Sequence, residues 1–159
     1  MKAQTSRFGL IEVQDKALLE FPGGIIGFPE STRYVILDHD RDVPFKWLQS
    51  LDEPDVAFVV MDPVLFKPEY RVEIDQKDIP ELTALDESDL TMFVILTIPS
   101  ADPQGITANL RAPVVVNHKT RIAKQVILKD ELPTRYPLFI PEPGQAGSNP
   151  EPIAIAASR

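Results

Sequence analysis

The chain of 159 residues contains no cysteine, which excludes disulfide bonds, thiolate metal ligands and a cysteine nucleophile. Long apolar runs are also missing, because the longest, Val56–Met61 and Met92–Leu96, are far too short to cross a membrane. The N-terminal stretch MKAQTSRFGLIEVQDK lacks the apolar core of a signal peptide. We therefore expect a soluble protein of the cytoplasm, where a fold needs no covalent cross-link.

Motifs for catalysis and for metal binding are scarce. One of only two histidines, His39, lies among Asp38, Asp40 and Asp42, a spacing that resembles the start of a calcium loop. The glycine at the sixth position and the closing glutamate of such a loop are missing, so we interpret these residues as a solvated acidic loop. The sequence contains no phosphate loop, dinucleotide fingerprint or zinc motif, and we expect no cofactor and no metal.

One pair of acidic residues leaves a catalytic alternative open. Asp52 and Asp55 could serve as general acid and base in a hydrolase or isomerase. This alternative predicts carboxylates that are buried in a pocket and have raised pKa values. Adjacent carboxylates at an exposed turn are more commonly just solvated. The residues themselves favour a binding or regulatory domain over an enzyme.

Proline is abundant, with 16 residues spread along the chain, and helices tolerate it badly. The segments between prolines are short and rich in β-branched and aromatic residues, a composition typical of strands. We predict about nine short strands and one short helix, Ile79–Leu90, with Asp78 as its N-cap. The first strand is predicted at Arg7–Val13, with Gly9 at a bulge or turn. Such a mainly β chain without a βαβ rhythm indicates an antiparallel barrel or sandwich.

The composition changes after Phe139, where proline, glycine, serine, asparagine and alanine dominate. We predict one β domain over residues 1–140 and a flexible, proline-rich tail over residues 141–159.

The stretch Phe45–Pro63, FKWLQSLDEPDVAFVVMDP, organises the predicted fold. Two apolar runs, Phe45–Leu51 and Val56–Met61, flank a short acidic link and predict a buried antiparallel hairpin with carboxylates at its tip. Residues 38–89 contain 15 acidic and 5 basic residues, a net charge of −10, against −8 for the whole chain. This charge disfavours direct binding to nucleic acid and suits a basic protein partner.

Three stretches, in this order, resemble the FliW family of bacterial flagellar assembly factors. They are FPGGIIGF (Phe21–Phe28), the hairpin stretch Phe45–Pro63, and ITANLRAPVVVNHKTRIAKQVIL (Ile106–Leu128). YPLF at Tyr136–Phe139 is similar to the closing segment of that family. The tail after Phe139 is longer than is usual for the family, and Gly23-Gly24 is unusual in the first motif.

The resemblance implies a small antiparallel β-barrel without catalytic activity and with two protein partners. One partner is CsrA, a basic, homodimeric RNA-binding repressor of translation, which FliW-like proteins antagonise. The other is the terminal region of flagellin, which competes for the same protein. Secretion of flagellin then frees the FliW-like protein to sequester CsrA and permits translation of flagellin mRNA.

We expect these partners to meet different residues. The edge facing CsrA is expected to be acidic, with Asp52, Glu53 and Asp55 as first candidates and Asp38, Asp40 and Asp42 as second. An amphipathic flagellin helix needs an apolar groove, for which the candidates are Ile25, Ile26, Phe28 and Phe66. Each of these four residues also suits a place in the core.

A further alternative is an unrelated β-barrel module that binds a peptide or a carbohydrate, because small barrels serve many functions. It predicts a cleft lined by several exposed aromatic residues.

Overall fold

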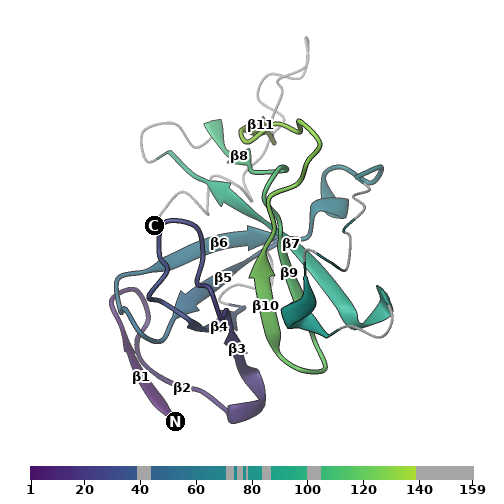
Figure 1. The fold of residues 1–159 in the computed structure, drawn as a ribbon. Coiled ribbons are helices and arrows are strands. Elements are labelled where there is room, and N and C mark those ends of the chain that lie inside the picture. Colours follow the sequence, from purple (N-terminus) through teal and green to yellow (C-terminus); the bar gives the residue numbers. More distant parts are fainter. Residues whose placement is uncertain are drawn as a thin grey trace.

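The computed structural model describes residues 1–38, 44–70, 74, 77, 79–83, 87–99 and 105–138. Seven strands form a closed barrel, because β7 pairs with both β6 and β9 and so joins the two ends of the series (Figure 1). These strands are β3 (Leu18–Glu20), β4 (Arg33–Leu37), β5 (Phe45–Ser50), β6 (Ala57–Met61), β7 (Leu90–Thr97), β9 (Val114–Asn117) and β10 (Ile122–Gln125). The predicted β-barrel is thereby confirmed. The neighbouring strands are antiparallel except β3 and β10, which run parallel.

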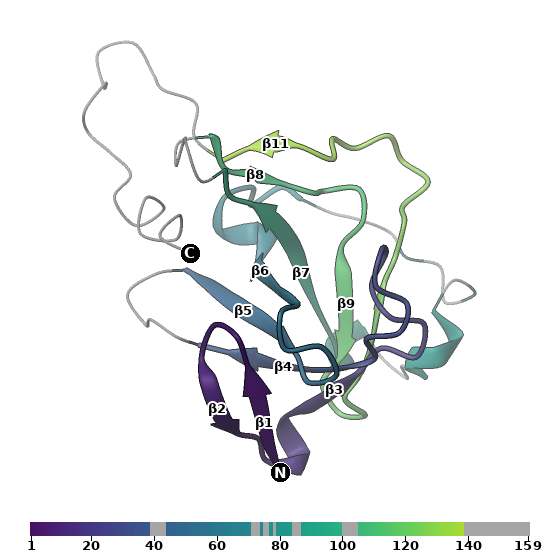
Figure 2. The same cartoon turned by 90° about the vertical axis from the view of Figure 1, so that its left-hand side faces the viewer.

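Four further strands lie outside the barrel. The N-terminal strands β1 (Lys2–Thr5) and β2 (Gly9–Glu12) form a separate hairpin (Figure 2). Strand β8 (Thr107–Ala108) extends the sheet beside β7, and β11 (Tyr136–Pro137) pairs with β8 and forms the sheet edge. No helix among the described residues is long and apolar enough to span a membrane.

The interior of the barrel is apolar. Each barrel strand contributes to one cluster through inward-facing residues, the pattern that a closed sheet requires. Its buried members are Leu19, Phe21, Ile25, Tyr34, Leu48, Val60, Val114, Val116 and Ala123. Other clusters cover the outside, and one of them lies under the β1–β2 hairpin, where Ala3 and Val13 pack on Val35. The hairpin is thus fastened to the outer face of β4.

The predicted central hairpin is confirmed as β5 and β6, with Gln49 opposite Ala57 and Phe45 opposite Met61. Strand β6 is covered on both faces. Val60 belongs to the interior cluster, whereas Val59 and Met61 belong to an outer cluster. The absence of polar residues from this strand therefore follows from its position between two cores.

Two predicted elements differ from the structure. The strand predicted at Arg7–Val13 is confirmed only over β2 (Gly9–Glu12), and β1 was missed because its buried residues are small, so its alternation is weak. The helix predicted at Ile79–Leu90 consists, where described, of two 3₁₀ turns, η4 (Pro80–Leu82) and η5 (Glu87–Asp89). Thr83 ends η4 with a left-handed φ of 47°, which interrupts helical geometry, and residues 84–86 lie outside the described part.

The loop between β3 and β4 contains a glycine-dependent turn. Ile25 forms a bridge with Phe28, and Gly24 and Gly27 have φ values of 70° and 92°. A Cβ on Gly24 would lie 2.4 Å from the carbonyl oxygen of Phe28. This position therefore requires glycine for its backbone angle and for its close contact.

We predict that Gly24→Ala lowers the free energy of unfolding by about 3 kcal/mol, because backbone strain and overlap act together. Gly9→Ala is a matched control, since Gly9 has φ 69° but a Cβ at this position would meet nothing within 4 Å. Strain alone makes it cost about 1 kcal/mol. Urea denaturation measures both values, and equal losses would show that the contact with Phe28 is unimportant.

Candidate partner-binding surfaces

The acidic turn between β5 and β6 is held to the start of β4 by Asp52. Its carboxylate accepts hydrogen bonds from the N–H groups of Thr32 at 2.9 Å and Arg33 at 3.0 Å. The Nε of Arg33 also donates to it at 2.8 Å. Asp52 is thus engaged by its own chain and offers little free charge to a partner.

These contacts set the pKa of Asp52. Partial burial raises the pKa, but the hydrogen bonds from the Thr32 and Arg33 backbones and the Arg33 side chain outweigh it. The net result is a pKa below the ordinary value. The hydrolase or isomerase alternative requires a raised pKa at this pair, and Asp52 shows the opposite.

Buried polar side chains hold the backbone of the turn through hydrogen bonds. Ser50 accepts hydrogen bonds from the N–H groups of Asp52 at 3.1 Å and Glu53 at 2.9 Å, and its hydroxyl also bonds Ser31. The Nε2 of Gln49 donates to the carbonyls of Ser50 (2.9 Å), Pro54 (3.3 Å) and Val56 (3.2 Å). Ser31, Gln49 and Ser50 are fully buried. The turn is therefore a preorganised structure.

The remaining acidic candidates divide into two groups. Glu53 lies beside Asp52 in the turn, and the exposed Asp55 accepts a hydrogen bond from the hydroxyl of Ser6. Asp38 lies elsewhere, because the register pairs Tyr34 with Ser50 and so puts the end of β4 far from the turn. Asp40 and Asp42 lie outside the described residues.

The four apolar candidates differ in how far they are buried. Ile25 is buried in the barrel interior, and Phe66 stacks on Tyr136 with ring centroids 5.9 Å apart, so both have packing roles. Ile26, by contrast, is 56% exposed. Phe28 is 36% exposed and packs edge-on against Phe58.

A groove of about 260 Å³ lies between the glycine-rich loop and β10. Its lining residues are Pro22, Gly23, Gly24, Ile25, Ile26, Gly27, Pro29, Glu81, Ala123, Lys124 and Gln125. The N–H of Ile26 donates to Oε1 of Gln125 at 3.0 Å, which holds the loop against β10. Lys124 and Glu81 form an ion pair of 3.0 Å in the same groove. Hydrogen bonds from the Glu81 backbone and then from Lys124 lower the pKa of Glu81.

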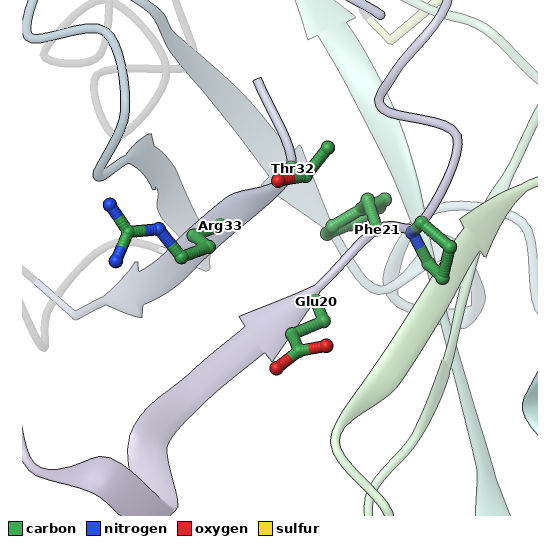
Figure 3. Close-up of a pocket in the computed structure, with 5 residues that line it drawn as sticks. Glu20, Phe21, Thr32 and Arg33 are labelled. Atoms are coloured by element: carbon green, nitrogen blue, oxygen red, sulfur yellow. The ribbon is translucent and has the colours of Figure 1, made fainter. Parts of the chain in front are cut away.

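A second cleft, of about 300 Å³, lies where β3 meets β4 and is shown in Figure 3. Glu20 and Arg33 are cross-strand neighbours, yet their charged groups point apart, and Arg33 binds Asp52 instead. The aromatic residue of this cleft, Phe21, is fully buried. It therefore offers no exposed ring for a sugar, as the carbohydrate alternative would need.

Sequence reasoning missed the residues that fix the acidic turn. Arg33 lies 19 positions before Asp52, and Ser6 lies 49 before Asp55. Neither spacing belongs to a local motif, so only the sheet register brings these residues together. The exposure of Ile26 was equally hidden, since its neighbour Ile25 has the same side chain and is buried.

We predict that Asp52→Asn lowers the free energy of unfolding at pH 7 by about 1–2 kcal/mol, the value of hydrogen bonds to a charged group near the surface. Because folding lowers the pKa of Asp52, its stabilisation is complete above the ordinary value of about 3.9. It is lost as the pH falls through the folded-state pKa. Denaturation from pH 7 to pH 2 should show the difference from the parent protein shrinking, and a constant difference would contradict this role.

Comparisons with known proteins agree on one family. The family model described as FliW protein matches residues 2–138. The flagellar assembly factor FliW of Alkaliphilus metalliredigens is 41% identical over 133 residues, covering 83% of this chain and 82% of its own. That of Treponema denticola is 41% identical over 130 residues, covering 82% and 87%.

A solved structure gives the same result. The crystal structure of the flagellar assembly factor FliW superposes with a TM-score of 0.80 at 36% identity, covering 88% of this chain and 98% of that one. The resemblance drawn from the sequence is thereby confirmed. The chain belongs to the FliW family of flagellar assembly factors.

Proposed function

We propose that this flagellar assembly factor binds CsrA in the cytoplasm and antagonises its repression of flagellin mRNA, with flagellin as the competing partner. Membership of the FliW family supports a non-catalytic role in flagellar assembly. The observation that carries the CsrA proposal is the preorganised acidic turn. Glu53 and Asp55 lie on a backbone that buried side chains fix, next to Asp52. The carboxylate of Asp52 is already hydrogen-bonded to Thr32 and Arg33.

Rigid carboxylates at the surface suit a basic partner, and of these two Asp55 is exposed and Glu53 is partly exposed. Charges at the rim of an interface chiefly raise the association rate and select the partner, and salt screens this effect. Because the buried Ser50 and Gln49 fix the backbone of the turn, little ordering entropy is lost when a partner binds. Of the predicted residues, we assign this role to Glu53 and Asp55 and give Asp52 a structural one.

The groove beside the glycine-rich loop suits flagellin. The loop holds Ile26 out into solvent, since its N–H is bound by Gln125 and its turn is fixed by Gly24 and Gly27. An apolar side chain that is held rigidly outward beside a groove is typical of a protein-binding site. An amphipathic terminal helix would cover Ile26 and Phe28 with its apolar face.

We predict that Glu53→Lys slows association with purified CsrA roughly threefold to tenfold at low salt and weakens the salt dependence of binding. Asp130→Lys is the control, because it makes the same charge change on an exposed residue outside the turn. Stopped-flow or surface plasmon resonance at two salt concentrations measures both effects. Unchanged rates and salt dependence in Glu53→Lys would refute the assignment of this turn.

We predict that Ile26→Asp weakens binding of a flagellin C-terminal peptide by about tenfold or more, because burial of an isoleucine side chain is lost. Leu10→Asp is the control. Leu10 is 61% exposed on β2, and Figure 2 shows the β1–β2 hairpin away from the loop that joins β3 to β4. Calorimetric titration compares the two variants. Equal effects of both substitutions would show that the groove is not the flagellin site.

A further inference from the structure

The edge of β10 that faces away from β9 is paired only where β10 begins. There the parallel strand β3 pairs Glu20 with Ile122, and the N–H of Glu20 donates to the carbonyl of Arg121 at 2.9 Å. Two residues further along the chain lies Pro22, which has no N–H group to donate to β10. The chain leaves β10 at this point as the glycine-rich loop, so the edge is open beyond the end of β3.

Gln125 and Ile127 direct their backbone groups along this open edge. The N–H groups of Val126 and Leu128 donate to carbonyls of the segment before β9, at 2.9 Å and 2.8 Å. Because successive residues of an antiparallel strand direct these groups to opposite sides, those of Gln125 and Ile127 point away from β9. In the described part of the chain, the N–H groups of these two residues have no hydrogen-bond partner. Such an edge is a template for another strand.

The groove beside this edge is largely apolar, and its charges cancel. Gln125 lines the groove together with the exposed Ile26, and the side chain of Ile127, two residues further, is 64% exposed. The two charged residues of the lining, Glu81 and Lys124, form an ion pair. An extended, uncharged segment with apolar side chains at alternating positions therefore matches both the edge and the groove.

The chain itself contains such a segment outside the described residues. Ile153–Ala157 consists of five uncharged apolar residues, and its two isoleucines are two positions apart, which places them on one face of a strand. It lies beyond the shared barrel, since the FliW model ends at residue 138. Ile153 lies 15 positions after Leu138, and an extended chain of that length spans about 50 Å, more than the diameter of a small domain. The segment is thus long enough to reach β10.

We propose that Ile153–Ala157 pairs in cis with the free edge of β10 as an additional strand. The N–H groups of Gln125 and Ile127 donate to its carbonyls, and its own N–H groups donate to the carbonyl of Gln125. Its isoleucines cover Ile127 and the groove beside Ile26. The tail then competes with flagellin for this groove. That consequence rests on the proposed function, whereas the pairing itself is tested without flagellin.

The test measures amide hydrogen exchange of the full chain by nuclear magnetic resonance. We expect the amides of Gln125 and Ile127 to exchange at least about tenfold more slowly in the parent chain than in the double variant Ile153→Asp/Ile155→Asp, because only the parent tail pairs with them. The amides of Val126 and Leu128 should remain equally protected in both proteins, since their bonds lie within the barrel.

The control variant is Ala146→Asp/Ser148→Asp, which adds the same two charges at the same spacing elsewhere in the tail. It should keep the slow exchange of Gln125 and Ile127. Fast exchange of these two amides in the parent chain overturns the proposal, as does slow exchange that persists in Ile153→Asp/Ile155→Asp. Protection that rises with protein concentration overturns pairing in cis and assigns the strand to a second copy.

Discussion

The end of the barrel that carries the acidic turn depends on the carboxylate of Asp52. Asp52 lies in the turn after β5 and binds Thr32, the residue before β4, and Arg33, the first residue of β4. It therefore connects β5 to β4 and to the loop that precedes β4. That loop is the one that carries Gly24, Ile26 and Phe28. The position of the apolar groove and the shape of the acidic turn are therefore tied to the same carboxylate, and a change at Asp52 would affect both surfaces through the fold.

The sequence does not distinguish the carboxylates of this turn from one another, but the structure does. Asp52 has a lowered pKa, satisfies backbone N–H groups and stabilises the turn. Glu53 and Asp55 follow it closely and lie where a basic surface could reach them. A charge count treats all of them alike, whereas the structure shows that Asp52 binds two backbone N–H groups and Arg33, and that Asp55 accepts from a single hydroxyl.

Strand-level features were predictable wherever the apolar pattern is strong. The β5–β6 hairpin is an example, because a fully apolar run such as Val56–Met61 needs cover on both faces. The pattern failed at β1, whose buried side chains are small, and at Ile79–Leu90, where the described residues form 3₁₀ turns before β7. Local spacing suggested a helix there, but the first turn ends at Thr83, which has a left-handed φ.

The site was only partly predictable for a different reason. The sequence located the acidic turn and the glycine-rich loop, since composition and turn residues are local properties. It could not reveal that Arg33 binds Asp52 or that the hydroxyl of Ser6 binds Asp55, because both contacts depend on how distant segments pack in the fold. Which member of a cluster is available to a partner is a tertiary property.

The outermost strand of the sheet, β11, consists of Tyr136 and Pro137. Proline has no N–H group to give to another strand, and two residues make a very short template. This edge is therefore poorly suited to pairing with a second copy of the chain. In a mainly β protein, this short edge with its proline is thereby protected against edge-to-edge pairing.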